Sequence, residues 1–297
     1  MKKYEVSVVI PNFNGEKLLE KNLPFLLKAK ENPDNCIVEI IIVDDDSQDG
    51  SVKLITKIFP EIRLIKHKIN RGFSAAVNTG VRMAKGDLVL LMNTDVVPSE
   101  NFLVPVFKHF DNEKVFAVSL HEKGFGWAKG SFSAGYIQLG MGEESEAAHS
   151  SFYVSGGSGV FRRAYWMKLS GMDEKLFSPF YWEDIDLCYR AGKRGYINLW
   201  EPEAKVEHNH ESTISKFPKS YVQRIRERNQ LLLIWKNIHS PKFIRNHALG
   251  VLRRLLRHPG YIRVVFMALG KLGIVMKERR KEIKLSKVSD EAIFMRF

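Results

Sequence analysis

The sequence predicts an α/β fold in which helices flank a mostly parallel central sheet, with a basic helical extension towards the C-terminus. Over the first hundred residues, short β-branched apolar runs alternate with segments of helical periodicity. This strand–helix order is typical of a parallel sheet with right-handed crossovers. Two of the apolar runs end abruptly in carboxylates, and such strand ends are where open α/β sheets bind their ligands.

The composition is that of a folded protein that works in a reducing compartment. The 297 residues are 44% hydrophobic and 27% charged, as in soluble globular proteins, which argues against disorder. The two cysteines, Cys36 and Cys188, supply neither a disulfide framework nor a metal cluster. No stretch reaches the ~18 uncharged residues of a membrane-spanning helix, and the first residues lack an apolar segment of signal-peptide length. We therefore expect a cytoplasmic protein.

The first predicted strand is the apolar run at residues 6–10, which ends at the turn-forming residues 11–15. A helix is predicted over residues 16–30, because its leucines recur on one side of the helix. The next elements of this half are expected at residues 37–43 (strand), 50–58 (helix) and 62–65 (strand).

Three consecutive acids, Asp44, Asp45 and Asp46, follow the second strand and admit two interpretations. Their mutual repulsion requires compensation by a cation, by hydroxyl donors or by solvent. In the first interpretation they belong to a ligand site at the end of the strand. In the second they form a solvated turn that caps the next helix, because Ser47 and Asp49 can accept hydrogen bonds from its first N–H groups.

A further carboxylate, Asp95, follows the apolar strand at residues 87–92. Two strands that end in carboxylates suit a metal–diphosphate site, because hard divalent cations prefer oxygen ligands and leave positions for phosphate oxygens. The alternative is a helix cap, since a new helix is expected to begin at residues 98–100. Before this strand, residues 70–72 form a turn into a helix whose small residues allow close packing on the sheet.

The middle of the chain is rich in glycine. Residues 121–151 interleave six glycines with aromatic and acidic residues, which predicts extended loops or a hairpin. The segment Ser155-Gly-Gly-Ser-Gly159 precedes a tight strand at residues 160–163, which we expect beneath or beside a site. It lacks the lysine and the spacing of a P-loop, so no phosphate site is predicted there.

A second acidic constellation begins at Glu183 and Asp184, which follow an aromatic pair and open a helix. The positive end of a helix keeps a carboxylate ionised, as a general base near neutral pH requires. The alternative is that the acids only complement the helix dipole. Asp186 and Arg190 are four residues apart and are expected to pair, and Cys188 is expected to be a small buried residue.

Two histidines, His208 and His210, follow a short predicted strand, and either could complete a metal shell beside carboxylates. As isolated histidines they are equally compatible with a structural or exposed position.

The positive charge is concentrated in the tail. The net charge is +12, but residues 219–297 hold 19 Lys and Arg against 5 Asp and Glu, whereas residues 1–218 hold 27 against 29. One interpretation is that helices in residues 241–297 lie on an anionic membrane surface. The other is a helical cover that is basic only because its outer face is solvated. No nucleic-acid partner is expected, because the tail contains no recognisable reading module.

The ordered set of these segments resembles the family 2 glycosyltransferases, an inverting group with the Rossmann-like GT-A fold. The markers are residues 8–14, 43–51, 70–73, 93–95 and 182–187, and the resemblance covers roughly residues 5–235. It implies a GT-A catalytic domain over residues 1–218, with a nucleotide-sugar-binding half (1–98) and an acceptor-binding half (99–218). Residues 219–297 would be the basic helical extension.

The resemblance also implies a role for each matching residue. Asp184 would be the general base, and Glu183 would orient the acceptor or that base. Asp95 would hold Mg²⁺ or Mn²⁺ together with His208, and Trp182 would contact the acceptor. The donor would be bound by Pro11, Asn14, Asp44, Asp46, Asn70, Gly72, Phe73, Asn93, Thr94 and Arg228.

One position departs from the family pattern. The family's metal motif is Asp-x-Asp, and its first acid is replaced here by Asn93. An amide oxygen can serve as a weak ligand, but one formal charge is lost. This loss makes His208 or His210 more important for binding a metal.

The function that the resemblance implies is inverting transfer of a sugar, from a UDP- or dTDP-sugar, to a hydroxyl of a glycan or lipid-linked acceptor. We expect this reaction in cell-surface polysaccharide synthesis, at the inner face of the cytoplasmic membrane. A nucleotidyltransferase would need a Gly-rich, cationic loop after the first strand, which residues 12–15 lack. A catalytically inactive binding scaffold is the other alternative, and intact Asp95 and Asp184 argue against it.

Overall fold

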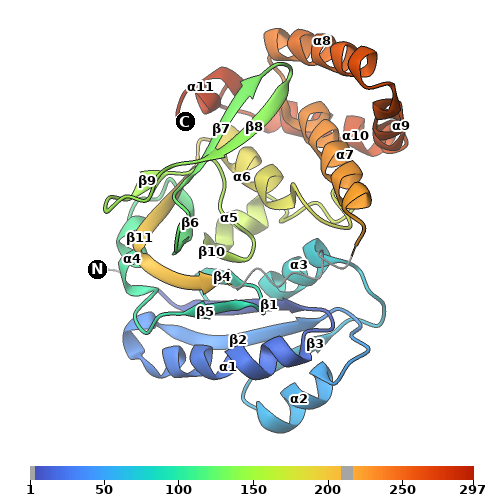
Figure 1. Ribbon diagram of the computed structural model, residues 1–297. Coiled ribbons are helices and arrows are strands. Elements are labelled where there is room, and N and C mark those ends of the chain that lie inside the picture. The colour runs from blue at the N-terminus through green and yellow to red at the C-terminus, as the bar shows by residue number, and fades with distance from the viewer. Residues whose placement is uncertain (1–3, 209–216) are drawn as a thin grey trace.

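The first strands bury both of their faces, because successive side chains in a strand point in opposite directions. In the computed structural model, which describes residues 4–208 and 217–297, Val8 and Ile10 of β1 (Val6–Asn12) belong to one core and Val9 to another. Helices therefore cover both faces of the sheet (Figure 1). The helices are α1 (Glu16–Glu31), α2 (Ser51–Ile58) and α4 (Val104–Phe110) on one face, and α3 (Phe73–Met83), α5 (Arg163–Lys168) and α6 (Glu183–Lys193) on the other.

The N-terminal half is parallel, as predicted. The strands β2 (Ile37–Asp44), β3 (Arg63–Lys66) and β4 (Leu88–Met92) join β1 in the order β3-β2-β1-β4. All five residues of β4 are buried, which explains its continuous apolar run.

The second half of the sheet is mixed. From β4 it continues through β10 (Ser158–Arg162), β6 (Val115–Glu122) and β11 (Ile197–His208) to β5 (Val96–Pro98), and β9 (His149–Ser150) pairs with β11. Strand β10 is antiparallel to both neighbours, while β11 is parallel to β6 and antiparallel to β5. The carboxyl ends of β2, β1, β4, β6 and β11 consequently lie at one edge of the sheet. We call this the carboxyl edge.

The helix that was predicted to begin at residues 98–100 begins later in the structure. Helix α4 begins only at Val104, and residues 99–103 form turns. The fully buried side chain of Asn35 explains the delay, because it donates to the carbonyl of Glu100 (2.7 Å) and accepts from the N–H of Leu103 (3.2 Å). The side-chain amide of Asn35 therefore binds backbone groups that a first helical turn would otherwise use.

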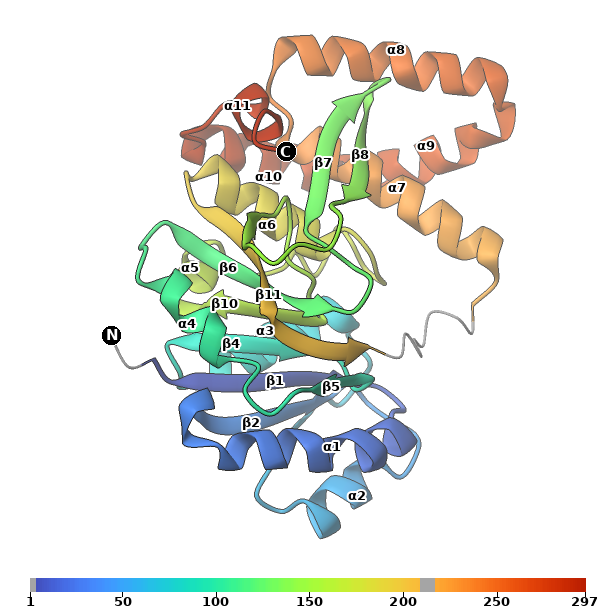
Figure 2. The ribbon, with the colours of Figure 1, turned by 60° about the vertical axis from the view of Figure 1, so that its left-hand side comes forward.

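The glycine-rich segment forms a hairpin, as predicted, between β7 (Ala128–Ser133) and β8 (Tyr136–Met141) (Figure 2). Its tip contacts α8 (Pro241–Arg257), where the Gly135 carbonyl lies 2.7 Å from Nδ1 of His247. Gly135 has φ 86°, and a Cβ there would lie 2.5 Å from the Asn246 carbonyl oxygen, so glycine is required.

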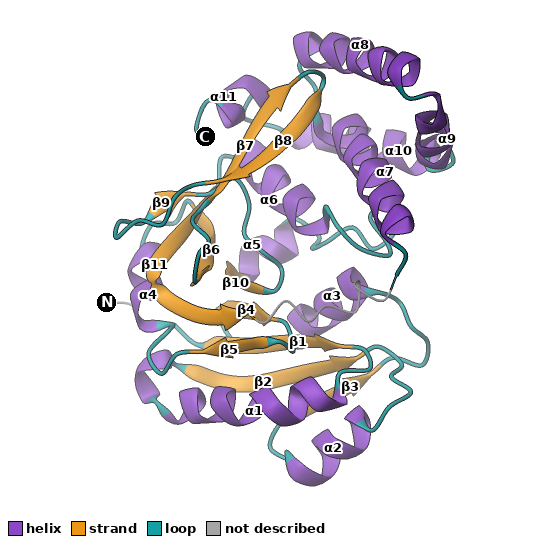
Figure 3. Ribbon diagram, viewed as in Figure 1, coloured by secondary structure: helices purple, strands orange, loops and turns teal. Residues whose placement is uncertain are grey.

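The C-terminal segment is helical, as predicted, and forms a layer beside α6 (Figure 3). Its elements are α7 (Lys219–Asn237), α8, the short 3₁₀ turn η3 (Pro259–Tyr261), α9 (Ile262–Leu269), α10 (Leu272–Leu285) and α11 (Asp290–Phe294). Trp182 and Ile185 share one core with Leu231 and Val264 of this layer. No single described helix is long and apolar enough to cross a membrane; Pro259–Leu269 and Leu272–Leu285 pass that test only as a pair bent by 67°.

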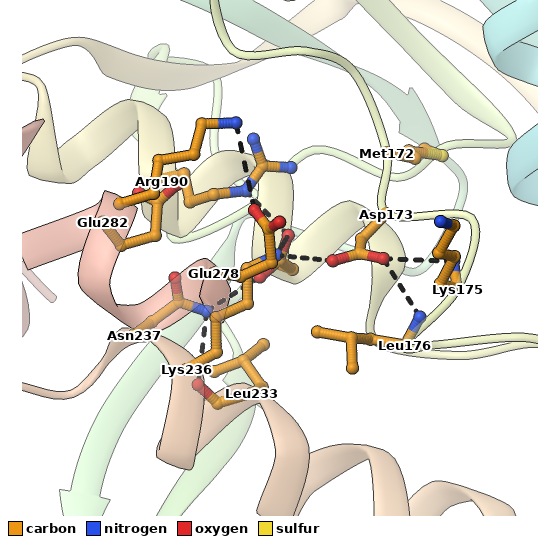
Figure 4. Close-up of polar contacts among 12 residues, drawn as sticks. Met172, Asp173, Lys175, Leu176, Arg190, Leu233, Lys236, Asn237, Glu278 and Glu282 are labelled. Atoms are coloured by element: carbon orange, nitrogen blue, oxygen red, sulfur yellow. Dashed lines mark hydrogen bonds and ion pairs between the residues drawn. The ribbon is translucent and has the colours of Figure 1, made fainter. Parts of the chain in front are cut away.

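A buried ion network fastens α7 to α6. Asp186 is 0% exposed and accepts from Arg190 Nε (2.8 Å), Lys236 Nζ (3.0 Å) and Asn237 Nδ2 (2.7 Å). Lys236 also donates to Asp173 at 3.0 Å (Figure 4). Burial alone would raise the pKa of Asp186, but the charges of Arg190 and Lys236 more than offset it and hold the pKa below its usual range. The predicted Asp186–Arg190 pair is confirmed, as is the burial of Cys188.

Candidate active site

The first polar group at the carboxyl edge joins β1 to β2. Asp44 is buried and accepts from Asn12 Nδ2 (2.8 Å) and from the N–H of Ser47 (3.1 Å). The Ser47 hydroxyl accepts from the N–H of Asn14 (2.9 Å). The loops after the two strands are thus tied together by hydrogen bonds around one carboxylate.

Asp45 organises the next loop, and the sequence did not single it out from its neighbours. Its carboxylate accepts from the N–H groups of Arg71 (2.9 Å) and Gly72 (2.7 Å) and lies 2.6 Å from His67 Nδ1. These bonds fold residues 70–72 over the strand ends and place Phe73 at the start of α3. Consecutive residues at a strand end point to opposite faces. This alternation could have indicated that Asp45 faces a different loop from Asp44.

The remaining residues predicted for the nucleotide side lie in the same loops. Pro11 is half-buried at the end of β1, and Asn70 is exposed in the folded turn. Asn14 and Asp46 both have left-handed backbones, with φ of 53° and 66°. The capping interpretation holds for Asp49, which accepts from the N–H of Ser51 at the start of α2 (3.0 Å). It is wrong for Ser47, whose hydroxyl accepts from Asn12 and from the N–H of Asn14 instead. It does not describe Asp45, whose partners lie in the turn at residues 67–72.

Asp95 and His208, the two predicted metal ligands, lie together at the same edge. His208 Nε2 is 3.1 Å from Asp95 Oδ1, and its Nδ1 is 2.9 Å from Glu122 Oε1. The Ser158 hydroxyl donates to Glu122 at 2.7 Å. Burial alone would lower the pKa of His208, but its hydrogen bonds to Asp95 and Glu122 outweigh burial and raise it to about 9. His210 lies outside the described residues.

The side chains at this site suit a divalent cation that takes its other ligands from a bound substrate. The imidazole of His208 bridges two carboxylates, so a cationic group is already stabilised there. Mg²⁺ or Mn²⁺ could take an oxygen of Asp95 and Nε2 of His208, while Glu122 fixes the ring through Nδ1. In the described part of the chain no three His, Cys, Asp or Glu side chains form a complete metal cage. Ions held against diphosphates take their remaining ligands from phosphate and water.

Asn93 and Thr94 connect this site to the segment at residues 155–159 and to the loop after β1. A Cβ on Gly157 would lie 2.4 Å from Asn93 Nδ2, so glycine lets the amide approach the backbone. The N–H of Asn93 donates to the Gly157 carbonyl (2.9 Å). The Thr94 methyl lies beside Gly15, where a Cβ would be 3.5 Å away.

The acid pair at the start of α6 lies next to this segment. Asp184 accepts from the N–H groups of Ile185 (2.8 Å) and Gly156 (3.4 Å). Glu183 is 7% exposed, and its Oε2 has no hydrogen-bond partner among the described residues. Burial, reinforced by the negative charge of Asp184, raises the pKa of Glu183 to about 8. Burial also raises the pKa of Asp184, against the opposing effect of its two backbone hydrogen bonds.

The loop before the acid pair is held by α7. Asn229 Nδ2 donates to the carbonyls of Phe177 (2.8 Å), Phe180 (2.9 Å) and Tyr181 (2.9 Å). Arg228 donates to the Ser178 carbonyl (2.6 Å) and is 8% exposed. Arg228 was expected to bind the donor, but its described hydrogen bonds are to the Ser178 carbonyl and to Asn229 Oδ1.

Two further side chains, Trp182 and Arg226, lie near the acid pair. Trp182 is 5% exposed and packs in the core of the C-terminal layer, so its contact with an acceptor stays a prediction. The exposed guanidinium of Arg226 lies 4.5 Å from the centre of the Tyr181 ring. Sequence reasoning missed Arg226 and Glu122, because their partners are distant in the chain.

The loops predicted to bind the nucleotide approach the loop that precedes Asp184. A Cβ on Gly156 would lie 3.2 Å from the Phe73 ring, and one on Gly72 would lie 3.8 Å from the Ser178 hydroxyl. Gly156 in turn donates to Asp184. The loop at Gly72 and Phe73 therefore lies next to the segment that holds Asp184.

The structure resembles solved glycosyltransferases. The mannosyltransferase PcManGT of Pyrobaculum calidifontis, in complex with GDP-Man and Mn²⁺, superposes with a TM-score of 0.58 over 95% of this chain and 86% of that chain, at 16% identity. GalNAc-T7, with UDP, GalNAc and Mn²⁺, gives 0.67 over 81% of this chain and 49% of that chain, also at 16% identity. At these identities the likeness shows the fold alone, which is the expected GT-A fold.

Sequence comparison identifies the family. An N-acetylglucosaminyl-diphospho-decaprenol L-rhamnosyltransferase of Mycobacterium tuberculosis is 25% identical over 252 residues, covering 72% of this chain and 79% of that protein. A GalNAc(5)-diNAcBac-PP-undecaprenol beta-1,3-glucosyltransferase of Campylobacter jejuni is 25% identical over 211 residues, covering 69% and 62%. The model of Glycosyl transferase family 2 matches residues 7–168, more than half of the chain. The chain therefore belongs to glycosyl transferase family 2 and is a glycosyltransferase.

Proposed function

We propose that the protein is an inverting glycosyltransferase that uses Asp184 as its general base and a nucleotide sugar as its donor. One observation carries the proposal. Asp184, at the start of α6, is hydrogen-bonded to Gly156, and the next residue, Gly157, contacts Asn93 at the carboxyl edge. The carboxylate of Asp184, which could accept a proton, is therefore linked through Gly156 and Gly157 to the carboxyl edge. Family 2 enzymes bind the donor diphosphate at this edge.

The donor would lie along the carboxyl edge, in the half formed by residues 1–98. Pro11, Asn14, Asp44 and Asp46 would surround the nucleoside, closed by the turn with Asn70, Gly72 and Phe73. Asn93, Thr94 and Arg228 would face the diphosphate. Mg²⁺ or Mn²⁺ held by Asp95 and His208 would supply positive charge against the departing diphosphate. UDP- and dTDP-sugars are the donors that we favour.

The residues around Asp184 would then perform one displacement. Asp184 takes the proton of an acceptor hydroxyl, whose oxygen forms the new bond to the anomeric carbon of the sugar. The bond from that carbon to the diphosphate breaks, and the nucleoside diphosphate leaves with the electron pair. Attack opposite the leaving group inverts the configuration. Glu183 and Trp182 would position the acceptor within residues 99–218, so the protein contributes mainly orientation and electrostatics.

The names of the relatives favour a lipid-linked acceptor. The rhamnosyltransferase and the glucosyltransferase are named for sugars attached through diphosphate to decaprenol and undecaprenol. We infer an acceptor of this class, in cell-surface polysaccharide synthesis. Such an acceptor is held in the membrane, so the proposal places the enzyme at the inner face of the cytoplasmic membrane.

A donor screen tests the proposal. The purified protein is incubated with UDP-, dTDP- and GDP-sugars and Mn²⁺, and donor binding is followed by thermal shift. We expect a uridine or thymidine donor to raise the melting temperature, and a chelator or Asp95→Ala to reduce that rise. Exposed Asp111→Asn is the matched control.

Release of nucleoside diphosphate on adding a lipid-linked acceptor distinguishes an enzyme from a binding scaffold. Donor binding without any release would favour the scaffold, and full activity in chelator would refute the metal site.

A further inference from the structure

Helices α8 and α9 each carry a second apolar face that nothing in the described structure covers. On α8 the exposed face contains Leu249 (46% exposed), Leu252 (54%) and Leu256 (74%), spaced so that they lie on one side of the helix. The opposite side packs inward through His247 and Gly250. A helix buried on one face needs polar residues on the other, so this stripe is unexplained by folding alone.

Helix α9 repeats the pattern just beyond the turn. Ile262 (40% exposed), Phe266 (64%) and Leu269 (43%) recur at intervals of four and three residues, while Val264 and Ala268 are buried. The turn η3 joins the two helices and contacts both. We call the exposed side chains of Leu252, Leu256, Ile262, Phe266 and Leu269 the α8–α9 corner.

The exposed charge of this corner is positive, and the nearby carboxylate of Glu227 on α7 is paired with Arg254. Residues 228–277 contain ten Lys and Arg and no Asp or Glu. Arg253, Arg257 and Arg263 are exposed within the corner itself, and Lys242 and Arg245 are exposed farther along α8. Apolar side chains that project between arginines match a surface that is anionic on the outside and hydrocarbon beneath.

We propose that the α8–α9 corner is the surface by which this protein binds an anionic phospholipid bilayer. Leu256 and Phe266 would enter the acyl boundary, and the arginines would contact the lipid phosphates. The proposal deepens the proposed function, because it rests on the acceptor being held in the membrane and assigns the surface that reaches it.

The corner is connected to the catalytic loop through one helix. Helix α9 packs against α7, and α7 holds the loop before Asp184 through Asn229 and Arg228. In two views α9 lies on the same side of the molecule as the start of α7 (Figures 1 and 2). Docking through the corner would therefore turn the catalytic loop towards the membrane that carries the acceptor.

Vesicle co-sedimentation tests the proposal without donor or acceptor. The full chain is mixed with phosphatidylcholine vesicles with or without phosphatidylglycerol. We expect binding to the anionic vesicles, and a fall of about tenfold or more in the partition coefficient for L256E/F266E and for R253E/R257E. Added salt should weaken binding of the wild type.

Matched controls use the far end of the molecule. Ile58 is 63% exposed on α2, beside exposed Lys53 and Lys57, so I58E and K53E/K57E make the same chemical changes elsewhere. Both controls should bind vesicles as the wild type does, and all variants should keep their circular dichroism spectra.

Three outcomes would overturn the proposal: no wild-type binding to anionic vesicles, equal binding by the corner variants, or displacement of the protein from vesicles by nucleic acid of equal charge. Asp184→Asn should bind vesicles normally. A failure of vesicle binding therefore leaves glycosyl transfer untouched, and a failure of transfer leaves the docking surface untouched.

Discussion

Glu183 and Asp184 are neighbours with different surroundings. Glu183 is buried with one oxygen unpartnered, whereas Asp184 is half-buried and accepts two backbone N–H groups. Ionising both would bring two negative charges together in a poorly solvated place. We infer that Glu183 keeps its proton near neutral pH, because burial and the adjacent carboxyl of Asp184 raise its pKa to about 8. Burial raises the pKa of Asp184 as well, and its backbone hydrogen bonds oppose that rise.

Replacing Asp184 with Asn should abolish transfer while leaving donor binding close to that of the wild type. The amide cannot accept the proton of the acceptor, and removal of a general base lowers rates by roughly 10²–10⁴-fold. Product formation and calorimetric titration with the donor would measure the two effects. Loss of donor affinity in this variant, but not in Asp111→Asn, would assign Asp184 to the donor pocket instead.

Glu183→Gln should change how stability depends on pH. The pKa of Glu183 is raised from 4.5 to about 8, so the folded protein keeps a proton that the unfolded chain releases. Wild-type stability therefore falls as the pH rises from about 4.5 to about 8. Glutamine does not titrate. The free energy of unfolding of the variant should therefore rise relative to that of the wild type between pH 4.5 and pH 8, by at most about 1.4 kcal/mol per unit of pKa shift. Urea unfolding at pH 5 and pH 8 measures this, and a constant difference would refute it.

Most of the candidate site residues could be proposed from the sequence because they stand at or after strand ends or at a helix start. Asp44, Asp95 and Asp184 are of this kind. Glu122 escaped notice because its partner His208 is 86 residues away. Asp45 escaped because a run of three acids does not reveal which of them accepts from the turn at Arg71.

At the scale of elements, α7 acts as a brace for the catalytic loop. Tyr181 and Trp182 both have left-handed backbones, with φ of 71° and 78°, directly before Glu183. Such conformations cost of order 1–3 kcal/mol each in residues other than glycine. The three hydrogen bonds from Asn229 offset part of that cost and fix the direction in which α6 begins.

Asn229→Ala should therefore destabilise the protein and slow catalysis. Three carbonyls share the two N–H donors of this amide, so at roughly 0.5–1.5 kcal/mol for each hydrogen bond the loss is about 1–3 kcal/mol. Chemical denaturation and kcat measure the two effects. Gln223→Ala, on an exposed part of the same helix, is the control; equal effects of the two changes would contradict the bracing role.

Most elements and the parallel N-terminal half could be predicted from the sequence, whereas the pairing of the later strands could not. Apolar runs identified β1, β2 and β4, and the glycine content of residues 121–151 favoured loops or a hairpin, of which the structure has the β7–β8 hairpin. The antiparallel insertion of β10 between β4 and β6 depends on contacts between residues far apart in the chain, such as Val160 with Leu90 and Val118. The start of α4 was misplaced for the same reason, because Asn35 lies 68 residues from Leu103.

At the scale of the whole molecule, the extension and the catalytic part share buried charges as well as one core. Asp290 of α11 is 1% exposed and accepts from Lys193 (2.8 Å) and Tyr189 (2.7 Å) of α6. It also accepts from the N–H groups of His239 and Ser240, between α7 and α8. We infer that these parts unfold together.

Asp290→Ala should lower the free energy of unfolding by about 3–5 kcal/mol, because it leaves Lys193 buried without its carboxylate. Calorimetry should show one transition at a lower temperature. Glu203→Ala removes a carboxylate that is 71% exposed and should have little effect. Two separate transitions in the Asp290 variant would contradict a shared folding unit.

The bond between Lys193 and Asp290 also has a consequence for the timing of synthesis. The two residues are 97 positions apart, so the ribosome completes α6 long before its partner exists. In a nascent chain that ends after β11, the helix that begins at Glu183 and Asp184 would have an uncompensated cation and an uncovered apolar side. Glycosyltransferase activity should thus appear only after residues 219–297 have been translated, so an incomplete chain would be inactive.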